Sequence, residues 1–209
     1  MKIKNLLPYA AASLVFLAIA LIYCAPALDG KVLLQGDVNN WRGAAQEART
    51  FYEETGNAPW WTNSMFSGMP TYQITGSTTS MKWRKTLETI SHFGFTGNME
   101  ATGIIFAYFF GFFLMLLCFG VNPWLSLAGA LAIGFSSYFF LIIPAGHLTK
   151  ACALASLAPM IGGFYAIFRK RYWLGAPLFV IYGIIGFTLH PQMTYYIGMM
   201  LGVLACAEL

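Results

Sequence analysis

The chain has 209 residues, of which 58% are hydrophobic and only 10% are charged. Soluble domains carry about 25% charged residues, so this composition excludes an ordinary water-soluble globular protein. The formal net charge of +4 would suggest nucleic acid binding in a soluble protein, but here the basic residues flank apolar segments, where they orient a membrane chain. Apolar runs of about 20 residues, the length that crosses a bilayer, predict an all-α polytopic transmembrane bundle.

The first apolar segment covers residues 6–28, directly after the basic start Met1–Lys4. A cleaved signal peptide is the alternative, because Ala25-Pro26-Ala27 has the small-residue pattern of a cleavage site. The apolar stretch is longer than the usual apolar region of about 7–15 residues in such peptides. We therefore favour a retained transmembrane helix over residues 1–28, with the following residues outside the cytoplasm.

Residues 29–99 form the only long polar region, which we predict to be an extracytoplasmic loop. Apolar side chains recur at helical spacing over Val38–Tyr52, with Asp37 at the position of an N-cap. Trp83, Leu87 and Ile90 form a second apolar stripe beside basic residues. Amphipathic helices of this kind commonly lie flat at a membrane surface, so we expect two interfacial helices in the loop.

Between these helices, the segment Pro59–Pro70 is rich in turn-forming and aromatic residues. Its tryptophans, Trp60 and Trp61, are typical of an interfacial aromatic belt, and they could alternatively pack over a site or stack on a sugar ring. The glycine- and serine-containing stretch Gly76–Ser80 predicts a flexible loop.

Residues 100–209 predict a bundle of five further transmembrane helices, which makes about six in the whole chain. The expected spans are Ala101–Phe119, Trp124–Ile143, Ala151–Phe168, Trp173–Leu189 and Met193–Leu209. The only basic cluster between spans, Arg169–Arg171, falls on the same side as Met1–Lys4, and basic flanks stay in the cytoplasm. The last span is short and has no basic anchor, so we expect this chain to be the N-terminal portion of a longer protein.

Three ionisable residues in separate loops return to the extracytoplasmic side under this topology. Asp37 follows the first span, His147 lies between the third and fourth spans, and His190 closes the fifth. Taken singly, these residues could be a helix cap, a solvated loop histidine and an interfacial histidine beside a proline turn. Lys150, one turn after His147, is a cation suited to a phosphate. Together they form a candidate functional site, because polar clusters at a membrane boundary are commonly functional.

The four cysteines, Cys24, Cys118, Cys152 and Cys206, lie in or beside apolar spans without a metal-binding or disulfide spacing. We expect them to be small packing residues. The sequence contains no phosphate-binding glycine loop, dinucleotide fingerprint, zinc motif or serine-nucleophile motif.

Several blocks of sequence resemble the YfhO family of bacterial membrane proteins, most closely its long forms from Bacteroidetes-type bacteria. The most specific block is Trp61-Thr62-Asn63-Ser64-Met65-Phe66-Ser67-Gly68-Met69-Pro70, and it is accompanied by Gly36-Asp37, Trp41-Arg42-Gly43, Ala145-Gly146-His147 with Lys150, and Gln192-Met193-Thr194-Tyr195-Tyr196. The resemblance spans nearly the whole chain, and the family's members are several times longer.

That family is similar to the GT-C superfamily of polytopic glycosyltransferases, which carry a catalytic acidic residue and two interfacial helices in the first outer loop. The resemblance implies a GT-C-like fold in the bacterial inner membrane, with Asp37 as the catalytic base. It implies a polyprenyl-phosphate sugar as donor and a cell-envelope polymer or lipid as acceptor. The expected substrate-binding residues are His147, Lys150, His190, Arg42 and Gln192.

Many GT-C enzymes have a paired acidic motif, whereas Asp37 has no acidic neighbour, so a divalent metal is possible but not expected. The alternative to an enzyme is a lipid or polymer transporter or a scaffold for envelope assembly. Ion-coupled transport is disfavoured because no ionisable residue is expected at mid-span between Ala101 and Phe168. A third possibility is that this portion is inert without the rest of the protein.

Overall fold

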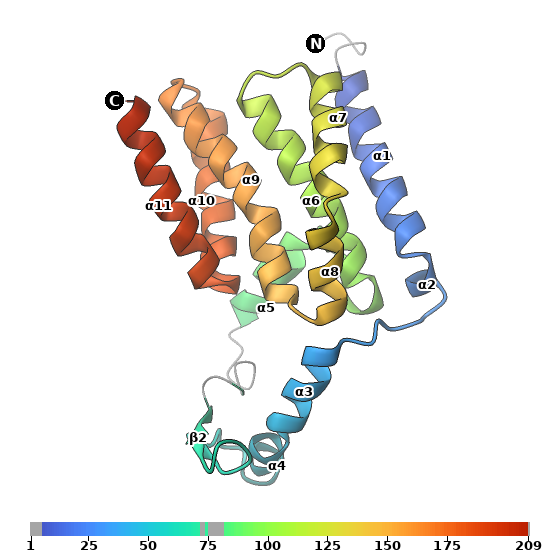
Figure 1. The fold of residues 1–209 in the computed structure, drawn as a ribbon, viewed down its shortest axis with the longest axis vertical. Helices are drawn as coiled ribbons and strands as arrows, with labels where there is room; N and C mark the ends of the chain where they lie inside the picture. Colours follow the sequence, from blue (N-terminus) through green and yellow to red (C-terminus); the bar gives the residue numbers. More distant parts are fainter. Residues whose placement is uncertain (1–5, 72–73, 75–81, 209) are drawn as a thin grey trace.

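The computed structural model describes residues 6–71, 74 and 82–208, and most of this chain is helical (Figure 1). Long helices run side by side in an antiparallel bundle: α1 (Leu7–Tyr23), α6 (Glu100–Cys118), α7 (Pro123–Gly134), α8 (Ser137–Ala145), α9 (Leu148–Phe168), α10 (Tyr172–Leu189) and α11 (Pro191–Glu208). The remaining elements gather beside or beyond one end of the bundle, which we call the loop end: α2 (Ala25–Leu28), α3 (Gly36–Ala44), α4 (Gln46–Thr55), α5 (Lys82–Ser91), the 3-10 helix η3 (Gly97–Met99) and the strands β1 (Trp61–Thr62) and β2 (Met69–Pro70).

The protein has the helices of a membrane protein. Among the described residues, three helices are long and apolar enough to cross a bilayer, over Gly97–Cys118, Leu148–Phe168 and Tyr172–Leu189. A fourth span is obtained if α7 and α8, which meet at 49°, count as one. Helix α1 is apolar but, with 17 residues, is one residue shorter than the 18 required of a membrane span. Helix α11 covers the sixth expected segment but is not among the helices that are both long and apolar enough. The helical bundle is therefore shown, while the number six stays a prediction.

The expected span over 124–143 is not one continuous helix, because the helix breaks between α7 and α8. Helix α7 ends at Gly134, and Ser136 takes an extended backbone conformation before α8 begins. Gly134 packs directly against the ring of Phe109, so closely that a Cβ atom would overlap the ring. This close approach depends on a partner 25 residues away, and an apolar run of sequence does not reveal it.

The first expected amphipathic helix is two helices, α3 and α4, that meet at the buried Ala45. The N-cap of α3 is Gln35 rather than Asp37, so the predicted capping role of Asp37 is wrong. Asp37 instead lies in the first turn of α3. Helix α4 ends at Gly56, whose φ of 71° is the left-handed conformation that terminates many helices.

The second expected helix is present as α5, but it packs against the loop ends of α6, α9 and α10. Leu87 of this helix contacts the main hydrophobic core. Between α4 and α5, β1 and β2 pair as a short antiparallel hairpin, with Trp61 opposite Pro70 and Thr62 opposite Met69. The expected loop at Gly76–Ser80 lies outside the described residues.

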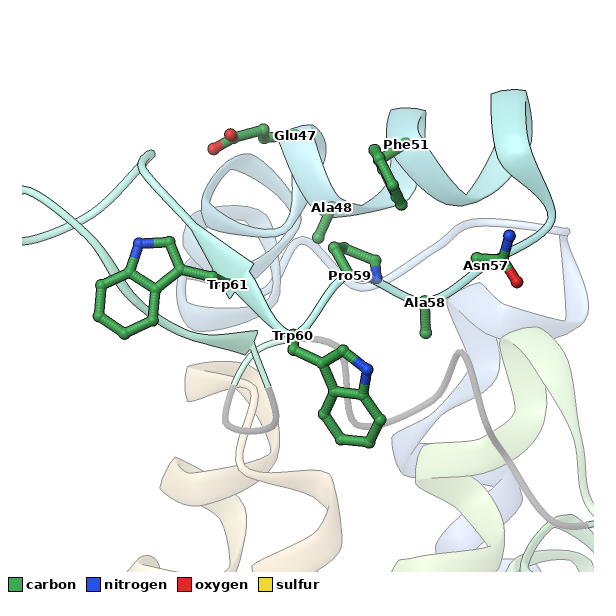
Figure 2. Close-up of a pocket in the computed structure, with 8 residues that line it drawn as sticks. All are labelled: Glu47, Ala48, Phe51, Asn57, Ala58, Pro59, Trp60 and Trp61. Carbon is green, nitrogen blue, oxygen red and sulfur yellow. The ribbon is translucent and has the colours of Figure 1, made fainter.

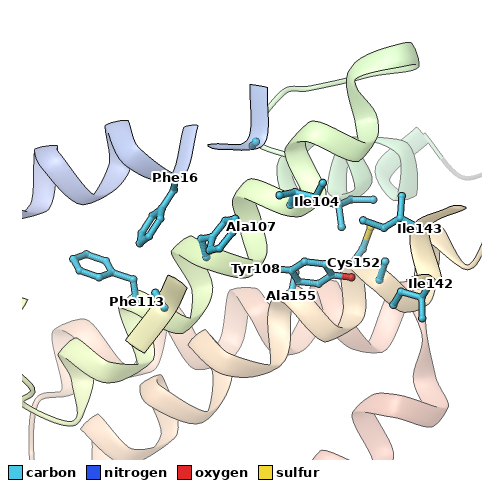
Figure 3. Close-up of a cluster of buried hydrophobic side chains, with 14 of the residues drawn as sticks. Phe16, Ile104, Ala107, Tyr108, Phe113, Ile142, Ile143, Cys152 and Ala155 are labelled. Atoms are coloured by element: carbon cyan, nitrogen blue, oxygen red, sulfur yellow. The ribbon is translucent and has the colours of Figure 1, made fainter. Parts of the chain in front are cut away.

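The hydrophobic core of the bundle includes aromatic contacts between α1 and α6, and it extends to buried residues of α9 (Figure 3). The ring of Phe16 stacks on that of Phe109 at 5.5 Å between centroids and meets Phe113 edge-on at 5.7 Å. On the other side, α9 approaches α10 so closely that a Cβ on Gly163 would lie 2.6 Å from the backbone nitrogen of Phe179. These contacts fix the positions of α9 and α10, whose loop ends carry His147 and His190.

Candidate functional site

The central feature of the loop end is a contact between Asp37 and His147, which come from segments 110 residues apart. The Oδ2 atom of Asp37 lies 3.2 Å from Nε2 of His147. Both side chains are about half exposed, at 55% and 51%. A carboxylate within hydrogen-bond distance of an imidazole can hold that ring and accept a proton from it, and the exposure leaves both groups open to a substrate.

This contact exists because the first turn of α3 docks on the turn between α8 and α9. The side-chain amide of Gln35 donates a hydrogen bond to the backbone oxygen of Ile143 at 2.7 Å. Gly146 has a φ of 104°, and a Cβ there would lie 3.1 Å from the backbone nitrogen of Val38 and 3.3 Å from Cβ of Asp37. Glycine therefore provides both the left-handed turn and the space for α3.

Lys150 and His190 lie close to His147 at the same end of the bundle. Lys150 follows His147 by one turn on α9, and its Nζ atom lies 5.5 Å from the ring centroid of Tyr138. Burial lowers the pKa of His190, and the charges of Lys150 and His147 lower it further. The Nδ1 atom of His190 is buried and has no hydrogen-bond partner among the described residues. The loop end thus brings one carboxylate, two imidazoles and one ammonium group into a single region.

Arg42 and Gln192, the other two predicted substrate-binding residues, lie outside the Asp37–His147 contact. Arg42 is exposed near the C-terminal end of α3, five residues after Asp37 and therefore on a different face of the helix. The side-chain amide of Gln192 donates to the hydroxyl of Tyr196, one turn along α11, at 3.0 Å. Within the described part of the chain, neither residue forms a hydrogen bond or ion pair with Asp37 or His147.

The described residues contain no group of three or more His, Cys, Asp or Glu side chains that could hold a metal ion. Asp37, His147 and His190 therefore do not form such a group among the described residues.

A second histidine cluster, which the sequence analysis missed, is buried where α5 packs on the bundle. His92 is only 4% exposed, and its Nε2 atom lies 2.8 Å from Sγ of Cys152 and 3.8 Å from Oε1 of Glu100. Burial lowers the pKa of His92 to about 4. Its backbone oxygen packs directly against Gly103 of α6. No motif marks this cluster, because His92 and Cys152 are 60 residues apart and meet only through the packing of α5.

The cysteines are free and only partly fit the expected packing role. Cys118 and Cys152 are buried, Cys24 is half-buried, and Cys206 is exposed.

The outermost part of the loop end is an aromatic groove between α4 and β1 (Figure 2). The groove has a volume of about 790 Å³ and is lined by Glu47, Ala48, Phe51, Asn57, Ala58, Pro59, Trp60 and Trp61. The two indole rings point away from each other.

A separate, mostly apolar cavity of about 320 Å³ lies between α1–α2 and the loop ends of α6 and α8. Its lining includes Lys31, Leu33, Ile105, Phe140 and Ile143. Because Ile143 is also the residue that accepts the hydrogen bond from Gln35, this cavity adjoins the segment that positions Asp37.

Comparison with known proteins adds no relative: no protein-family model, no curated protein and no solved structure matches this chain.

Proposed function

We propose that the protein is a GT-C-like glycosyltransferase that uses a polyprenyl-phosphate sugar on the outer face of the bacterial inner membrane. The observation that carries this proposal is the contact between Asp37 and His147, with Lys150 one turn away. A partly exposed base next to a cation, at the end of a membrane bundle, suits a reaction in which a hydroxyl attacks a phosphate-bearing substrate. The resemblance to the YfhO family supports the same assignment.

In this mechanism, Asp37 accepts the proton of the acceptor hydroxyl as that oxygen attacks the anomeric carbon of the donor sugar. The bond between that carbon and the phosphate oxygen breaks on the opposite face, so the configuration inverts and lipid phosphate leaves with the electron pair. A general base must lie within hydrogen-bond reach of the proton that it removes. His147 holds the Asp37 carboxylate at 3.2 Å, and Lys150 stabilises the negative charge of the departing phosphate.

The apolar cavity beside Leu33 and Phe140 offers space for part of the lipid chain close to this chemistry. Lys31 at its rim supplies a positive charge for the phosphate. Anchoring the lipid at one boundary would bring donor and acceptor together and reduce the entropic cost of their encounter.

The basic residues support an outer location for the loop end. Arg169–Arg171 connects α9 to α10 at the opposite end of the bundle, where α1 also begins. Positively charged flanks remain in the cytoplasm, so we assign the opposite end and the N-terminus to the cytoplasm and the loop end to the outside.

A transporter of lipid or polymer is the second candidate, and the break between α7 and α8 favours it. Discontinuous helices often form substrate sites in transporters, and these two helices meet at 49°. A transporter would move a lipid-linked sugar without breaking its bond to phosphate, so the chemical fate of the donor separates the two functions.

The test is turnover by the purified full-length protein in liposomes that contain polyprenyl-phosphate glucose, galactose or mannose labelled in the sugar. We expect release of lipid phosphate with the wild type and its loss with Asp37→Asn. Asp29→Asn, which removes an exposed carboxylate earlier in the same loop, is the control and should keep wild-type turnover. Equal turnover by Asp37→Asn and wild type would reject the assigned role of Asp37, and movement of intact donor across the bilayer would favour transport.

A further inference from the structure

Trp60 is held on a fixed backbone while its side chain is left in solvent. Its backbone oxygen accepts a hydrogen bond from the amide of Thr71 at 3.1 Å, and the hydroxyl of Thr71 donates to the oxygen of Pro59. The side chain of Trp60 is nevertheless 87% exposed. A large aromatic ring on a fixed backbone has only two side-chain torsions to immobilise, so it loses little conformational entropy when it binds a ligand.

The polar residues of the groove are also fixed before any ligand arrives. The Oε2 atom of Glu47 accepts hydrogen bonds from the hydroxyl of Thr62 at 2.6 Å and from the backbone amide of Asn63 at 3.0 Å. The side-chain amide of Asn57 donates to the backbone oxygen of Thr55 at 3.2 Å. These bonds hold a carboxylate and an amide at opposite ends of an apolar floor formed by Ala48, Phe51 and Pro59. The groove volume of about 790 Å³ lies within the range of small-molecule sites, roughly 300–1,000 Å³.

The charge of the groove selects among ligand classes. Its described lining contains one carboxylate, that of Glu47, and no Lys or Arg. A phosphate, an anionic lipid headgroup or a nucleic acid would meet a negative charge without a cation to offset it. A neutral oligosaccharide fits better, because the C–H face of one ring can lie on an indole while hydroxyls along the chain donate to the carboxylate and accept from the amide.

We propose that the aromatic groove binds a neutral oligosaccharide, with one sugar ring stacked on Trp60 and hydroxyls of other rings bonded to Glu47 at one end of the groove and to Asn57 at the other. Helix α3 connects this groove to the candidate site. Its axis rises about 11 Å over the residues from Asp37 to Ala44, and Ala45 then leads directly into α4, which carries Glu47. One part of an extended glycan could therefore lie in the groove while a nearer hydroxyl reaches Asp37. Identifying the bound glycan with the acceptor rests on the proposed function, whereas its binding to the groove does not.

The experiment measures binding without a donor, so its result is independent of sugar transfer. The full chain is labelled with 5-fluorotryptophan, and the fluorine resonance of Trp60 is assigned as the one that disappears in Trp60→Phe. Neutral trisaccharides of glucose, mannose, galactose and N-acetylglucosamine are then titrated into the detergent-solubilised protein. Glycerol at matched hydroxyl concentration controls for solvent effects. Phe66→Ala is the matched variant, because Phe66 is 82% exposed on the same hairpin but does not line the groove.

We expect at least one trisaccharide to shift the Trp60 resonance saturably, in the wild type and in Phe66→Ala alike. Trp60→Ala, with its fold checked by the five remaining tryptophan resonances, should reduce affinity for that sugar at least tenfold in a direct binding measurement. The proposal is overturned if no trisaccharide shifts the resonance. It is also overturned if the resonance shifts only with phosphatidylglycerol vesicles or with a cationic ligand such as choline. Sugar binding together with an inactive donor assay would retain this proposal and reject the proposed function.

Discussion

The two histidine clusters of the loop end meet the same helix, α9, but their surroundings differ. His147 precedes α9 and pairs with Asp37, and both side chains are about half exposed. Cys152, five residues further on, contacts His92, which is almost completely buried. A histidine beside an exposed carboxylate can exchange protons with a substrate, whereas one held neutral by burial contributes to packing. The comparison shows that surroundings, rather than residue type, separate the candidate reactive site from the structural one.

The largest expected effect is the loss of the exposed carboxylate. Asp37→Asn should lower the transfer rate by about 100- to 10,000-fold, the range over which general bases contribute, because an amide cannot accept the acceptor's proton. His92→Gln should lower the rate less than Asp37→Asn, since His92 lies outside the proposed reaction. The measurement is the turnover number with labelled polyprenyl-phosphate sugar, at matched amounts of folded protein. A larger loss in His92→Gln would reverse the assignment of the two clusters.

The second prediction concerns the dependence of stability on pH. Because burial lowers the pKa of His92 to about 4, the unfolded chain binds a proton at this residue between pH 6.5 and 4 while the folded chain does not. His92 therefore contributes stability that is fully present above pH 6.5 and is lost as the pH falls toward 4. The loss amounts to about 3 kcal/mol, from a pKa difference of about 2.5 at about 1.36 kcal/mol per pKa unit.

Thermal unfolding of the detergent-solubilised protein from pH 8 to pH 4 measures this loss. In His92→Gln the fall in unfolding temperature between pH 6.5 and 4 should be smaller, because the titrating group is gone. Gln192→Ala, which removes no titrating group, provides the control and should keep the wild-type decline. Other titratable or polar groups also surround His92, namely Glu88, Glu100, Ser91 and Cys152. If the decline is the same in both variants, these other groups rather than His92 determine it.

Much of the bundle could be predicted from the sequence, because apolar runs of membrane-spanning length have few alternative structures. The break after Gly134 could not, because the uninterrupted apolar run gives no sign of it, nor of the close approach of Gly134 to the ring of Phe109 in another helix. The topology argument predicted that Asp37, His147 and His190 would return to one end, and the structure brings the first two into contact. The distance between Asp37 and His147, and the need for glycine at position 146, depend on how α3 docks on the bundle. The burial of His92 depends on how α5 packs, which no local pattern records.

The third prediction tests that docking. Gly146→Ala should destabilise the protein by about 1–3 kcal/mol, because a non-glycine residue at φ 104° is strained and its Cβ would press on Val38 and Asp37. The strain should also separate Asp37 from His147 and lower transfer. Gly56→Ala is the matched control, since Gly56 also has a positive φ of 71° but nothing lies within 4 Å of its Cβ position. We expect both variants to lower the unfolding temperature and only Gly146→Ala to lower turnover per folded molecule.

The smallest effect is expected at Gln192, which the family resemblance places in the site but whose side chain bonds to Tyr196 along α11. That bond joins two exposed side chains, so its loss in Gln192→Ala should change stability by less than about 0.5 kcal/mol. Turnover should fall less than twofold, because Asp37, the proposed base, contacts His147 rather than α11. The measurement is the same donor assay with KM and kcat determined separately. A tenfold rise in KM with an unchanged kcat would instead show that Gln192 contacts the substrate. The substrate-binding region would then extend from α3 across His190 to the first turn of α11.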